Sequence, residues 1–306
     1  MVRLTIFTPT FNRINTLKKL YDSLLIQTNK EFEWIIIDDG STDHTEEMVK
    51  GWLKGNNQFP ISYRYKKNEG KHIAINEGAK VASGKWFFIV DSDDMLTSNA
   101  IERVLHYCDS IDNIPSFAGV VGLRGNQNGE AWNNWYQEGN ARRLKSNKSS
   151  IENVEYLDAT SIEYRYKYKV RGDRAEVIRT DLLRRYPFPK FSGEKFLVES
   201  YLWLQLANDG YKFRWFNSII YLTEYLQDGL TNNIEEHYKK SPLGSMAVYN
   251  LMVASKGLPL TEKIKAAYNY CIYGFYAGKS HTELFKTIKN KAVFPIGLFL
   301  ATIRKK

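Results

Sequence analysis

The segment KWFFIVDSDDML, residues 85–96, decides the fold that we expect for this chain. Five consecutive apolar residues end at Val90, and Asp91, Asp93 and Asp94 follow at once. An uninterrupted apolar run is typical of a parallel strand that is buried on both faces. Carboxylates this close repel one another, and folding alone gives no reason to gather them. The cluster therefore predicts a bound cation at the end of a buried strand.

Strand-like apolar segments alternate with segments of helical periodicity before this point. Strands are expected at 3–8, 32–38, 61–66 and 86–91, and helices are expected at 14–28, 45–52 and 71–83. This order predicts an α/β fold whose sheet is largely parallel. Ligands of open α/β sheets bind beyond the carboxyl ends of the strands, so we expect the site at that edge.

Polar clusters follow three of the expected strands, namely TPTFNR at 8–13, DDGS at 38–41 and DSDD at 91–94. Because the carboxyl ends of parallel strands meet at one edge of a sheet, the three loops should converge. Mg²⁺ and Mn²⁺ favour carboxylate oxygens and usually bind one or two of them together with substrate phosphates. The alternatives are ordinary turns, with an Asp-Gly pair in the second loop and Asp94 capping the next helix in the third.

The glycine motifs that bind phosphate in other nucleotide folds are missing from the sequence. There is no G-x-x-x-x-G-K-[ST] motif, and no G-x-G-x-x-G follows the first strand. Pro9, Phe11 and Asn12 stand where those folds have glycines. We therefore expect a metal ion, rather than a glycine-rich loop, to hold the phosphates.

The four motifs TPTFNR, IIIDDGSTDHT, NEGKHIAINEGAKVASGKW and FIVDSDD occur in this order within about residues 3–105. In residues and spacing they resemble the donor half of family 2 glycosyltransferases, which are inverting enzymes with a GT-A fold. A weaker similarity continues through FSGEKFLVESYLWLQLANDGYKF, residues 191–213. The resemblance implies a Rossmann-like sheet that is mixed but mostly parallel and is flanked by helices.

The resemblance also implies a domain organisation. Residues 1–228 would form the catalytic domain, with the donor half at 1–125 and the acceptor half at 126–228. Residues 229–306 match no catalytic motif of the family, and we expect them to form a helical C-terminal extension.

Five residues would bind the donor nucleotide if the resemblance holds: Pro9, Phe11, Asp39, Lys71 and Asp91. Pro9 and Phe11 would line the base pocket, and Asp39 would bond the base, most often uracil. Lys71 would lie near the donor, while Asp91 would approach the ribose or a water on the metal. The alternative for Lys71 is a solvated lysine at the start of a helix.

The resemblance further implies that Asp93 ligates Mn²⁺ or Mg²⁺, with Asp94 beside it. Family members usually take the general base from a Glu-Asp pair before a helix, which favours Glu199 first and Glu194 second. Ser200 stands where the aspartate of that pair is usual. If both glutamates lay on one helix, five residues would turn it by roughly 140°, so only one could face the cleft. An exposed or helix-capping glutamate is the alternative for each.

Aromatic and basic side chains between the two matched segments are candidates for acceptor contacts. Trp132, Trp135 and Tyr136 would stack on sugar rings or pack in the core. The segment 167–180 alternates like a strand and carries Arg171, Asp173 and Arg174. The two arginines would meet the donor diphosphate or an anionic acceptor, or lie on a solvated strand face.

The implied activity is metal-dependent inverting transfer of a hexose or N-acetylhexosamine from a nucleotide-diphosphate donor, most often a UDP-sugar. The acceptor would be a hydroxyl of a saccharide or lipid-linked saccharide, in the synthesis of bacterial cell-surface polysaccharide such as capsule. The alternatives are a nucleotidyltransferase and a catalytically inactive protein that binds sugar nucleotides, the latter favoured only by Ser200. A net charge of +9 would suit nucleic-acid binding, but the acidic loops would repel phosphates, so no nucleic-acid partner is expected.

Positive charge is concentrated near the C-terminus, where seven lysines and arginines accompany one glutamate from residue 279 onward. The segment KAVFPIGLFLATIRKK, residues 291–306, is apolar for about a dozen residues between basic ends. That is too short to span a membrane, but it suits an amphipathic segment on an anionic membrane surface. The alternative is a helix docked on the domain.

Cys108 and Cys271 provide neither a disulfide framework nor metal-ligand spacing, and the N-terminal VRLTIF lacks a signal-peptide pattern. We therefore expect a cytoplasmic location, at the inner face of the cell membrane if the C-terminal segment binds lipid.

Overall fold

A computed structural model describes residues 1–126, 128–131, 155–223 and 233–304. Within these residues nine strands form one sheet in the order β3-β2-β1-β4-β8-β6-β9-β5, and β7 pairs with β9. The strands are β1 Leu4–Thr10, β2 Phe32–Asp38, β3 Ile61–Tyr65, β4 Trp86–Ile89, β5 Met95–Leu96, β6 Phe117–Gly125, β7 Tyr156–Ala159, β8 Arg174–Arg179 and β9 Lys212–Leu222. The four strands predicted from the sequence are confirmed.

Six strands run in the same direction, so their carboxyl ends share one edge of the sheet. β1 pairs in parallel with β2 and β4, and β2 pairs in parallel with β3. β8 lies antiparallel between β4 and β6, and β9 is parallel to β6. The short β5 and β7 are antiparallel to β9. The sheet is therefore mixed and mostly parallel, as predicted.

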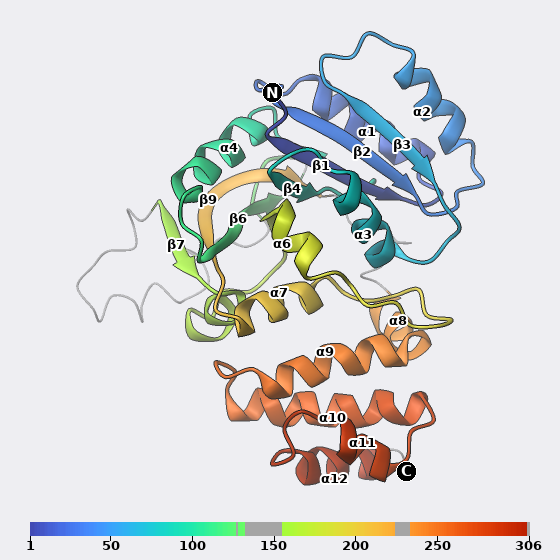
Figure 1. Cartoon of the computed structure of the whole chain (residues 1–306), viewed down its shortest axis with the longest axis vertical. Helices are drawn as coiled ribbons and strands as arrows, with labels where there is room; N and C mark the ends of the chain where they lie inside the picture. The colour runs from blue at the N-terminus through green and yellow to red at the C-terminus, as the bar shows by residue number, and fades with distance from the viewer. Residues whose placement is uncertain (127, 132–154, 224–232, 305–306) are drawn as a thin grey trace.

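Helices cover both faces of this sheet (Figure 1). One face packs against α1 Ile14–Leu25, α2 Thr45–Leu53 and α4 Ala100–Ile111. The other face packs against α3 Lys71–Val81, α6 Thr180–Arg185 and α7 Ser200–Asn208. The three predicted helices are confirmed as α1, α2 and α3, with ends that differ by a few residues.

Cover on both faces explains why the central strands are apolar throughout. All residues of β1 are buried, and in β2 the fully buried Trp34 donates from indole Nε1 to Thr8 Oγ1 at 2.9 Å. Gly78 of α3 lies so close to the ring of Phe7 that a Cβ there would overlap it. The close packing of α3 on β1 fixes the helix whose first residue is Lys71.

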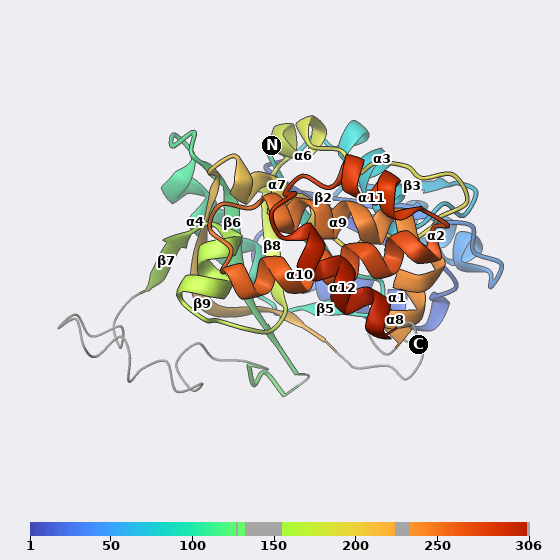
Figure 2. The same cartoon turned by 90° about the horizontal axis from the view of Figure 1, so that it is seen from below.

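In the described part of the chain, five helices follow β9. They lie beneath the sheet in Figure 1, with α10 and α12 nearest the viewer in Figure 2. They are α8 Ile234–Lys240, α9 Pro242–Ala254, α10 Leu260–Tyr276, α11 His281–Thr287 and α12 Phe294–Arg304. α9 packs against α7 on one side and α10 on the other, and α12 packs against α10. The predicted boundary between residues 228 and 229 lies outside the described residues.

The last helix has one face on the extension and another in solvent. Phe294 and Ala301 are buried. The outer face forms an apolar ridge of the exposed side chains Ile296, Phe299, Leu300 and Ile303. Among the described residues, no helix combines the length and the apolar composition needed to cross a membrane.

The segment 167–180 departs from its prediction, because only Arg174–Arg179 forms a strand. Lys169 and Gly172 have positive φ angles of 59° and 88°, which interrupt an extended chain, and a π-helical turn at Glu163–Lys167 precedes them. Arg174 itself is buried rather than solvated, and its Nε donates to the hydroxyl of Tyr164 at 3.0 Å.

The predicted aromatic cluster of Trp132, Trp135 and Tyr136 lies outside the described residues.

Candidate active site

The loops after β1 and β2 are tied together at the shared sheet edge. The backbone N–H of Asn12 donates to Ser41 Oγ at 2.8 Å, and Asn12 Oδ1 accepts from the Thr42 N–H at 2.8 Å. Asp43 Oδ2 also accepts from the Ile14 N–H at 3.1 Å. The predicted convergence of these two loops is therefore present in the structure.

The first loop presents an aromatic ring at this edge. Pro9 is buried within β1, whereas Phe11 directly after the strand is 46% exposed. Thr10 between them is buried, and its hydroxyl has no hydrogen-bond partner within the described residues. An exposed ring and an unsatisfied hydroxyl at the ligand edge of the sheet suit a planar, polar ligand.

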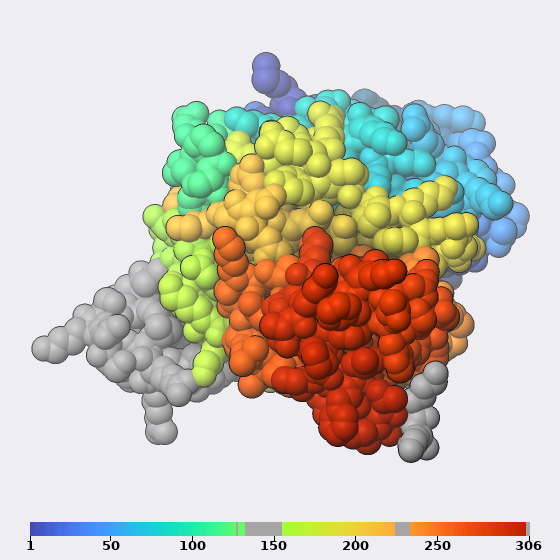
Figure 3. Space-filling model, turned by 60° about the horizontal axis from the view of Figure 1, so that its bottom comes forward, coloured from blue at the N-terminus to red at the C-terminus, as the bar shows by residue number. Residues whose placement is uncertain are grey.

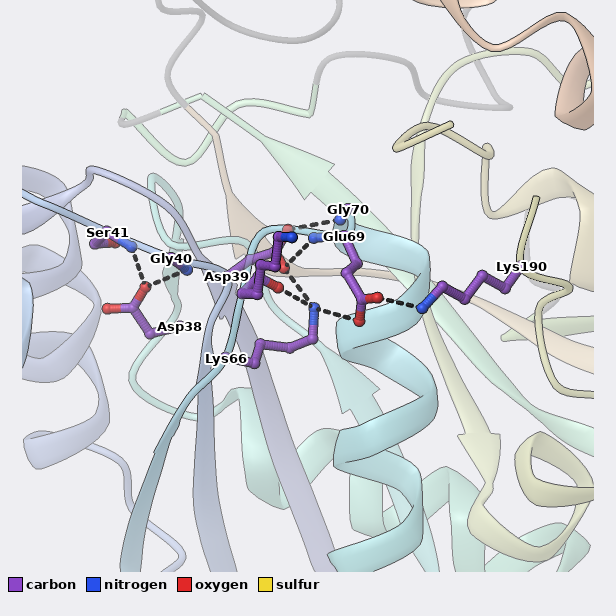
Figure 4. A network of polar contacts seen from close by, with 9 residues as sticks. Asp38, Asp39, Gly40, Ser41, Lys66, Glu69, Gly70 and Lys190 are labelled. Atoms are coloured by element: carbon purple, nitrogen blue, oxygen red, sulfur yellow. Dashed lines mark hydrogen bonds and ion pairs between the residues drawn. The ribbon is translucent and has the colours of Figure 1, made fainter. Parts of the chain in front are cut away.

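Asp39, at the end of β2, is held in a network of polar contacts (Figure 4). Its Oδ1 accepts from Lys66 Nζ at 2.7 Å and from the Glu69 N–H at 2.9 Å, and its Oδ2 accepts from the Gly70 N–H at 2.7 Å. Glu69 in turn pairs with Lys190. These bonds use three of the roughly four acceptor positions of the carboxylate. Asp39 therefore fixes the loop that precedes α3, which the sequence did not indicate.

Lys71 links the end of β4 to the start of α7. Its Nζ lies 2.6 Å from Asp91 Oδ1 and 2.6 Å from Glu199 Oε1. Burial would lower the pKa of Lys71, but the two carboxylates outweigh it and raise the pKa above its ordinary value. Burial would raise the pKa of Asp91, but Lys71 and Arg124 outweigh it and hold that pKa below its usual range. Lys71 is thus a paired ammonium rather than a solvated lysine.

Asp93 and Asp94 have much weaker compensation than Asp91. Arg13 Nε lies 4.0 Å from Asp93 Oδ2, and Arg124 Nη1 lies 3.9 Å from Asp94 Oδ2, which is too far for hydrogen-bonded pairs. Burial, followed by the charge of Asp91, raises the pKa of Asp93 and raises the pKa of Asp94 to about 7. Negative charge at this loop is under-compensated, so the donor set fits a cation.

The described residues contain no group of three or more His, Cys, Asp and Glu side chains arranged to hold a metal. A site of one or two carboxylates completed by substrate phosphates is the usual form for Mg²⁺, and it needs no such group. The pair Asp93 and Asp94 matches that smaller donor set in number and in kind.

Asp94 does not cap the helix that follows it, so that alternative is wrong. α4 begins at Ala100 with Asn99 before it. The Asp94 N–H donates to the Asp91 carbonyl at 3.2 Å, which closes a turn within the acidic loop.

Three residues that the sequence analysis missed complete this region: Arg124, Glu176 and Tyr221. Tyr221 Oη accepts from the Asp91 N–H at 2.9 Å, and the Arg124 guanidinium lies 4.2 Å from the centre of the Tyr221 ring. Burial raises the pKa of Glu176 to about 7, although Arg124 opposes the shift. Arg124 and Tyr221 end β6 and β9, so the rule about strand ends could have found them.

The two candidate bases do not lie on one helix. Glu199 directly precedes α7, with its side chain toward Lys71. Glu194 lies in the connection before it and accepts from the N–H groups of Leu243 and Gly244, both at 2.8 Å. Its carboxylate therefore caps α9, and Glu199 is the glutamate that meets the acidic loop.

A mostly parallel sheet of this order, with acidic loops at the strand ends and a carboxylate opposite them, has the architecture of the GT-A fold. The family model described as Glycosyl transferase family 2 matches residues 5–170, and the chain belongs to that family. Membership of this family favours a glycosyltransferase over the nucleotidyltransferase alternative.

Curated relatives are also named as glycosyltransferases. A glycosyltransferase of Rickettsia felis is 41% identical over 107 residues, which are 35% of this chain and 17% of that protein. The chain thus matches about a sixth of the length of the first curated relatives. The GalNAc(5)-diNAcBac-PP-undecaprenol beta-1,3-glucosyltransferase of Campylobacter jejuni is 23% identical over 292 residues, covering 94% of this chain and 87% of that protein.

Solved structures share the fold at low sequence identity. TarS of S. aureus in complex with UDP-GlcNAc has a TM-score of 0.60 at 18% identity, over 98% of this chain and 79% of that chain. The mannosyltransferase PcManGT from Pyrobaculum calidifontis in complex with GDP-Man and Mn²⁺ has a TM-score of 0.53 at 15% identity, over 99% of this chain and 75% of that chain.

Proposed function

We propose that this glycosyltransferase moves a hexose or N-acetylhexosamine from a UDP-sugar to a hydroxyl of a saccharide acceptor, with inversion at C1. The observation that carries the proposal is the bridge from Asp91 through Lys71 to Glu199. This bridge connects the acidic loop after β4 with Glu199, the residue just before α7. A structural relative bound to UDP-GlcNAc supports the choice of donor.

The nucleotide would lie over the joined loops of β1 and β2. The exposed Phe11 would offer an apolar surface for the base, together with Pro9 two residues earlier once the ligand is bound, and the Thr10 hydroxyl would offer a polar contact. Asp39 retains one acceptor position that a uracil N–H could use, while its other bonds hold the loop in place.

Asp93 and Asp94 would hold Mn²⁺ or Mg²⁺. When bound, such an ion acts as a Lewis acid on the leaving diphosphate. The raised pKa values of both carboxylates support this assignment, because a cation would favour their charged forms. A structural relative that contains Mn²⁺ supports it further.

Glu199 would act as the general base. The hydroxyl of an acceptor has a pKa far above neutrality, so a carboxylate must take its proton while the oxygen attacks C1. Attack from the face opposite the leaving group gives a β-linkage from an α-linked donor. Lys71 would orient Glu199 Oε1 and leave the other carboxylate oxygen for the acceptor.

The acceptor half, residues 126–228, and the extension, residues 229–306, would determine the acceptor. The Campylobacter relative, named for a lipid-linked acceptor and matched over most of both chains, supports a lipid-linked saccharide. The match covers residues of the extension as well, which supports treating the extension as part of the enzyme. The enzyme would act in polysaccharide synthesis on the cytoplasmic side of the cell envelope.

The apolar ridge on α12 would rest on an anionic membrane surface. Its members recur at the spacing of one helix face, and Phe299 is 64% exposed. Lys286, Lys289 and Lys291 are exposed in the segment just before this helix. Apolar area plus basic charge is the combination that holds an interfacial helix on anionic lipid.

Vesicle binding tests the membrane surface. Sedimentation with phosphatidylglycerol vesicles should weaken at least about tenfold in the double variant Phe299→Ser and Ile303→Ser, because apolar burial is lost. Ile26→Ser removes a side chain of equal exposure, 64%, on the catalytic body and serves as the control. Equal sedimentation of the double variant and the parent would remove the membrane from the proposal.

Donor binding and transfer test the activity. Thermal unfolding with each nucleotide sugar, with and without Mn²⁺, should show stabilisation by UDP-sugars that depends on the metal. Glu199→Gln should abolish transfer and keep donor binding, while Glu283→Gln, far along the chain in α11, should change neither. Near-full transfer by Glu199→Gln would reject the assigned base.

A further inference from the structure

The connection between α6 and α7 runs between α3 and α8 (Figure 1). The space-filling view in Figure 3 shows this yellow segment lying directly against the orange and red extension. On the side of α3, Lys190 pairs with Glu69, and the Lys195 carbonyl lies so close to Gly70 that a Cβ there would overlap it. The connection that leads to Glu199 is therefore held by two separate parts of the chain.

On the side of the extension, the carboxylate of Glu194 is hydrogen-bonded to the first turn of α9. Its two oxygens accept from the Leu243 and Gly244 N–H groups, each at 2.8 Å. The first N–H groups of a helix have no partner within the helix, and negative charge is favourable at that end. A carboxylate that accepts from both groups is anchored at the N-terminus of α9.

A second contact lies two residues further along the connection. The Phe196 N–H donates to Ser241 Oγ at 3.2 Å, and Ser241 is 2% exposed. Gly244 allows α9 to come this close, since a Cβ there would lie 3.0 Å from the Phe196 carbonyl oxygen. Leu197, which follows Phe196 in the connection, is buried in the core that α7 and α9 share.

We propose that Glu194 is a positioning residue, through which the N-terminus of α9 sets the place of the catalytic base. The inference rests on the proposed role of Glu199, which follows Glu194 by five residues. The helical extension then belongs to the active-site architecture, and transfer depends on it even when acceptor and enzyme are both in free solution.

Glu194→Gln tests this inference, with a short water-soluble acceptor and the full-length chain. The amide can satisfy only one of the two N–H groups, so the connection should shift, and kcat should fall about tenfold because small misplacements of a catalytic group are costly. The donor KM and the calorimetric affinity for UDP with Mn²⁺ should stay within about twofold, since Glu194 touches neither. The acid limb of the pH–kcat profile should keep its position, because the base is unchanged.

Glu283→Gln is the matched control. Glu283 caps α11 in the same extension by accepting from the Ser280 N–H at 2.8 Å, but it makes no contact with the connection among those described. It loses the same kind of helix cap, so its kcat should stay within about twofold of the parent. A fall in kcat equal to that of Glu194→Gln would show a general effect of destabilising the extension and overturn the proposal.

The two glutamate variants separate failure of this inference from failure of the proposed base. An inactive Glu199→Gln with a fully active, folded Glu194→Gln overturns only the positioning role. Loss of transfer in Glu194→Gln with near-full transfer in Glu199→Gln makes Glu194 the base and overturns both.

If Glu194→Gln does not fold, Ser241→Ala decides the question, because it removes the acceptor of the Phe196 N–H and leaves the α9 cap in place. Its kcat should fall about threefold with an unchanged donor KM, and an unchanged kcat overturns the proposal.

Discussion

The acidic loops after β2 and β4 lie at the same edge of the sheet, but the carboxylates of the two loops differ in how closely their partners approach. Asp39 accepts three hydrogen bonds from its own chain. The guanidinium groups nearest to Asp93 and Asp94 lie 4.0 Å and 3.9 Å away, and the pKa values of both carboxylates are raised. A buried carboxylate with its partners present contributes to the fold, whereas one without them costs stability until a ligand arrives. The contrast distinguishes Asp39, whose carboxylate holds its own loop in place, from Asp93 and Asp94, to which we assign the metal.

The largest effect on activity is expected from Asp93→Asn. The amide keeps the shape but loses the charge that we assign to the metal, so transfer should fall about 10²- to 10³-fold, the equivalent of several kcal/mol. The unfolding temperature without metal should not fall, because an unfavourable charge is removed. Initial rates and calorimetry in the same buffer measure both. Parent-like rates with Mn²⁺ would place the metal elsewhere.

Lys71→Met should lower both the stability of the fold and the rate of transfer. Asp91 and Glu199 would then face each other without their shared cation, and stability should fall by about 2 kcal/mol at neutral pH, with a smaller loss in acid. Transfer by the folded variant should fall about tenfold or more, because Glu199 loses its orientation. Urea unfolding at two pH values measures the first effect, with Lys71→Arg as the control that keeps the charge. Equal stability of Met and Arg variants contradicts the expectation.

Asp39→Asn should destabilise the folded protein, whereas Asp93→Asn should not. It breaks contacts with Lys66 and the loop before α3, so the free energy of unfolding should fall by about 2 kcal/mol. Asp22→Asn, in an exposed pair with Lys18, is the control and should cost less than about 0.5 kcal/mol. If Asp39→Asn unfolds at the same urea concentration as the parent, the Asp39 carboxylate does not stabilise the loop before α3.

The smallest effect is a pH dependence due to Asp94. Its folded pKa of about 7 lies above the ordinary value of an aspartate, so the folded state holds this proton more tightly than the unfolded chain. Its contribution to stability should therefore decline as pH rises from about 4 to about 7. Unfolding of metal-free protein across this range should show a decline that Asp94→Asn lacks. Identical pH profiles of variant and parent would argue against the raised pKa.

Much of this scaffold could be predicted from the sequence. Apolar runs and helical periodicity gave the first four strands and three helices, because parallel strands and their covering helices leave local patterns. Strand ends located Phe11, Asp39 and the DSDD loop for the same reason.

The rest depends on tertiary pairing that no local pattern records. Arg124 of β6 lies 3.9 Å from Asp94, which follows β4, although the antiparallel β8 separates these two strands in the sheet. Tyr221 of β9 accepts from the Asp91 N–H across 130 residues of sequence, and the register of β9 against β6 is irregular before it. The role of Glu194 as a cap required knowledge of a helix that starts about fifty residues later in the chain.

Gly70 has a consequence for engineering. Its φ of +97° and its contact with the Lys195 carbonyl exclude any side chain, so the loop before α3 and the connection to α7 pack directly against each other. Transplanting the connection alone, in order to exchange acceptor specificity, would disrupt that packing. A chimera that carries residues 66–71 and 186–200 from the same donor protein would preserve it.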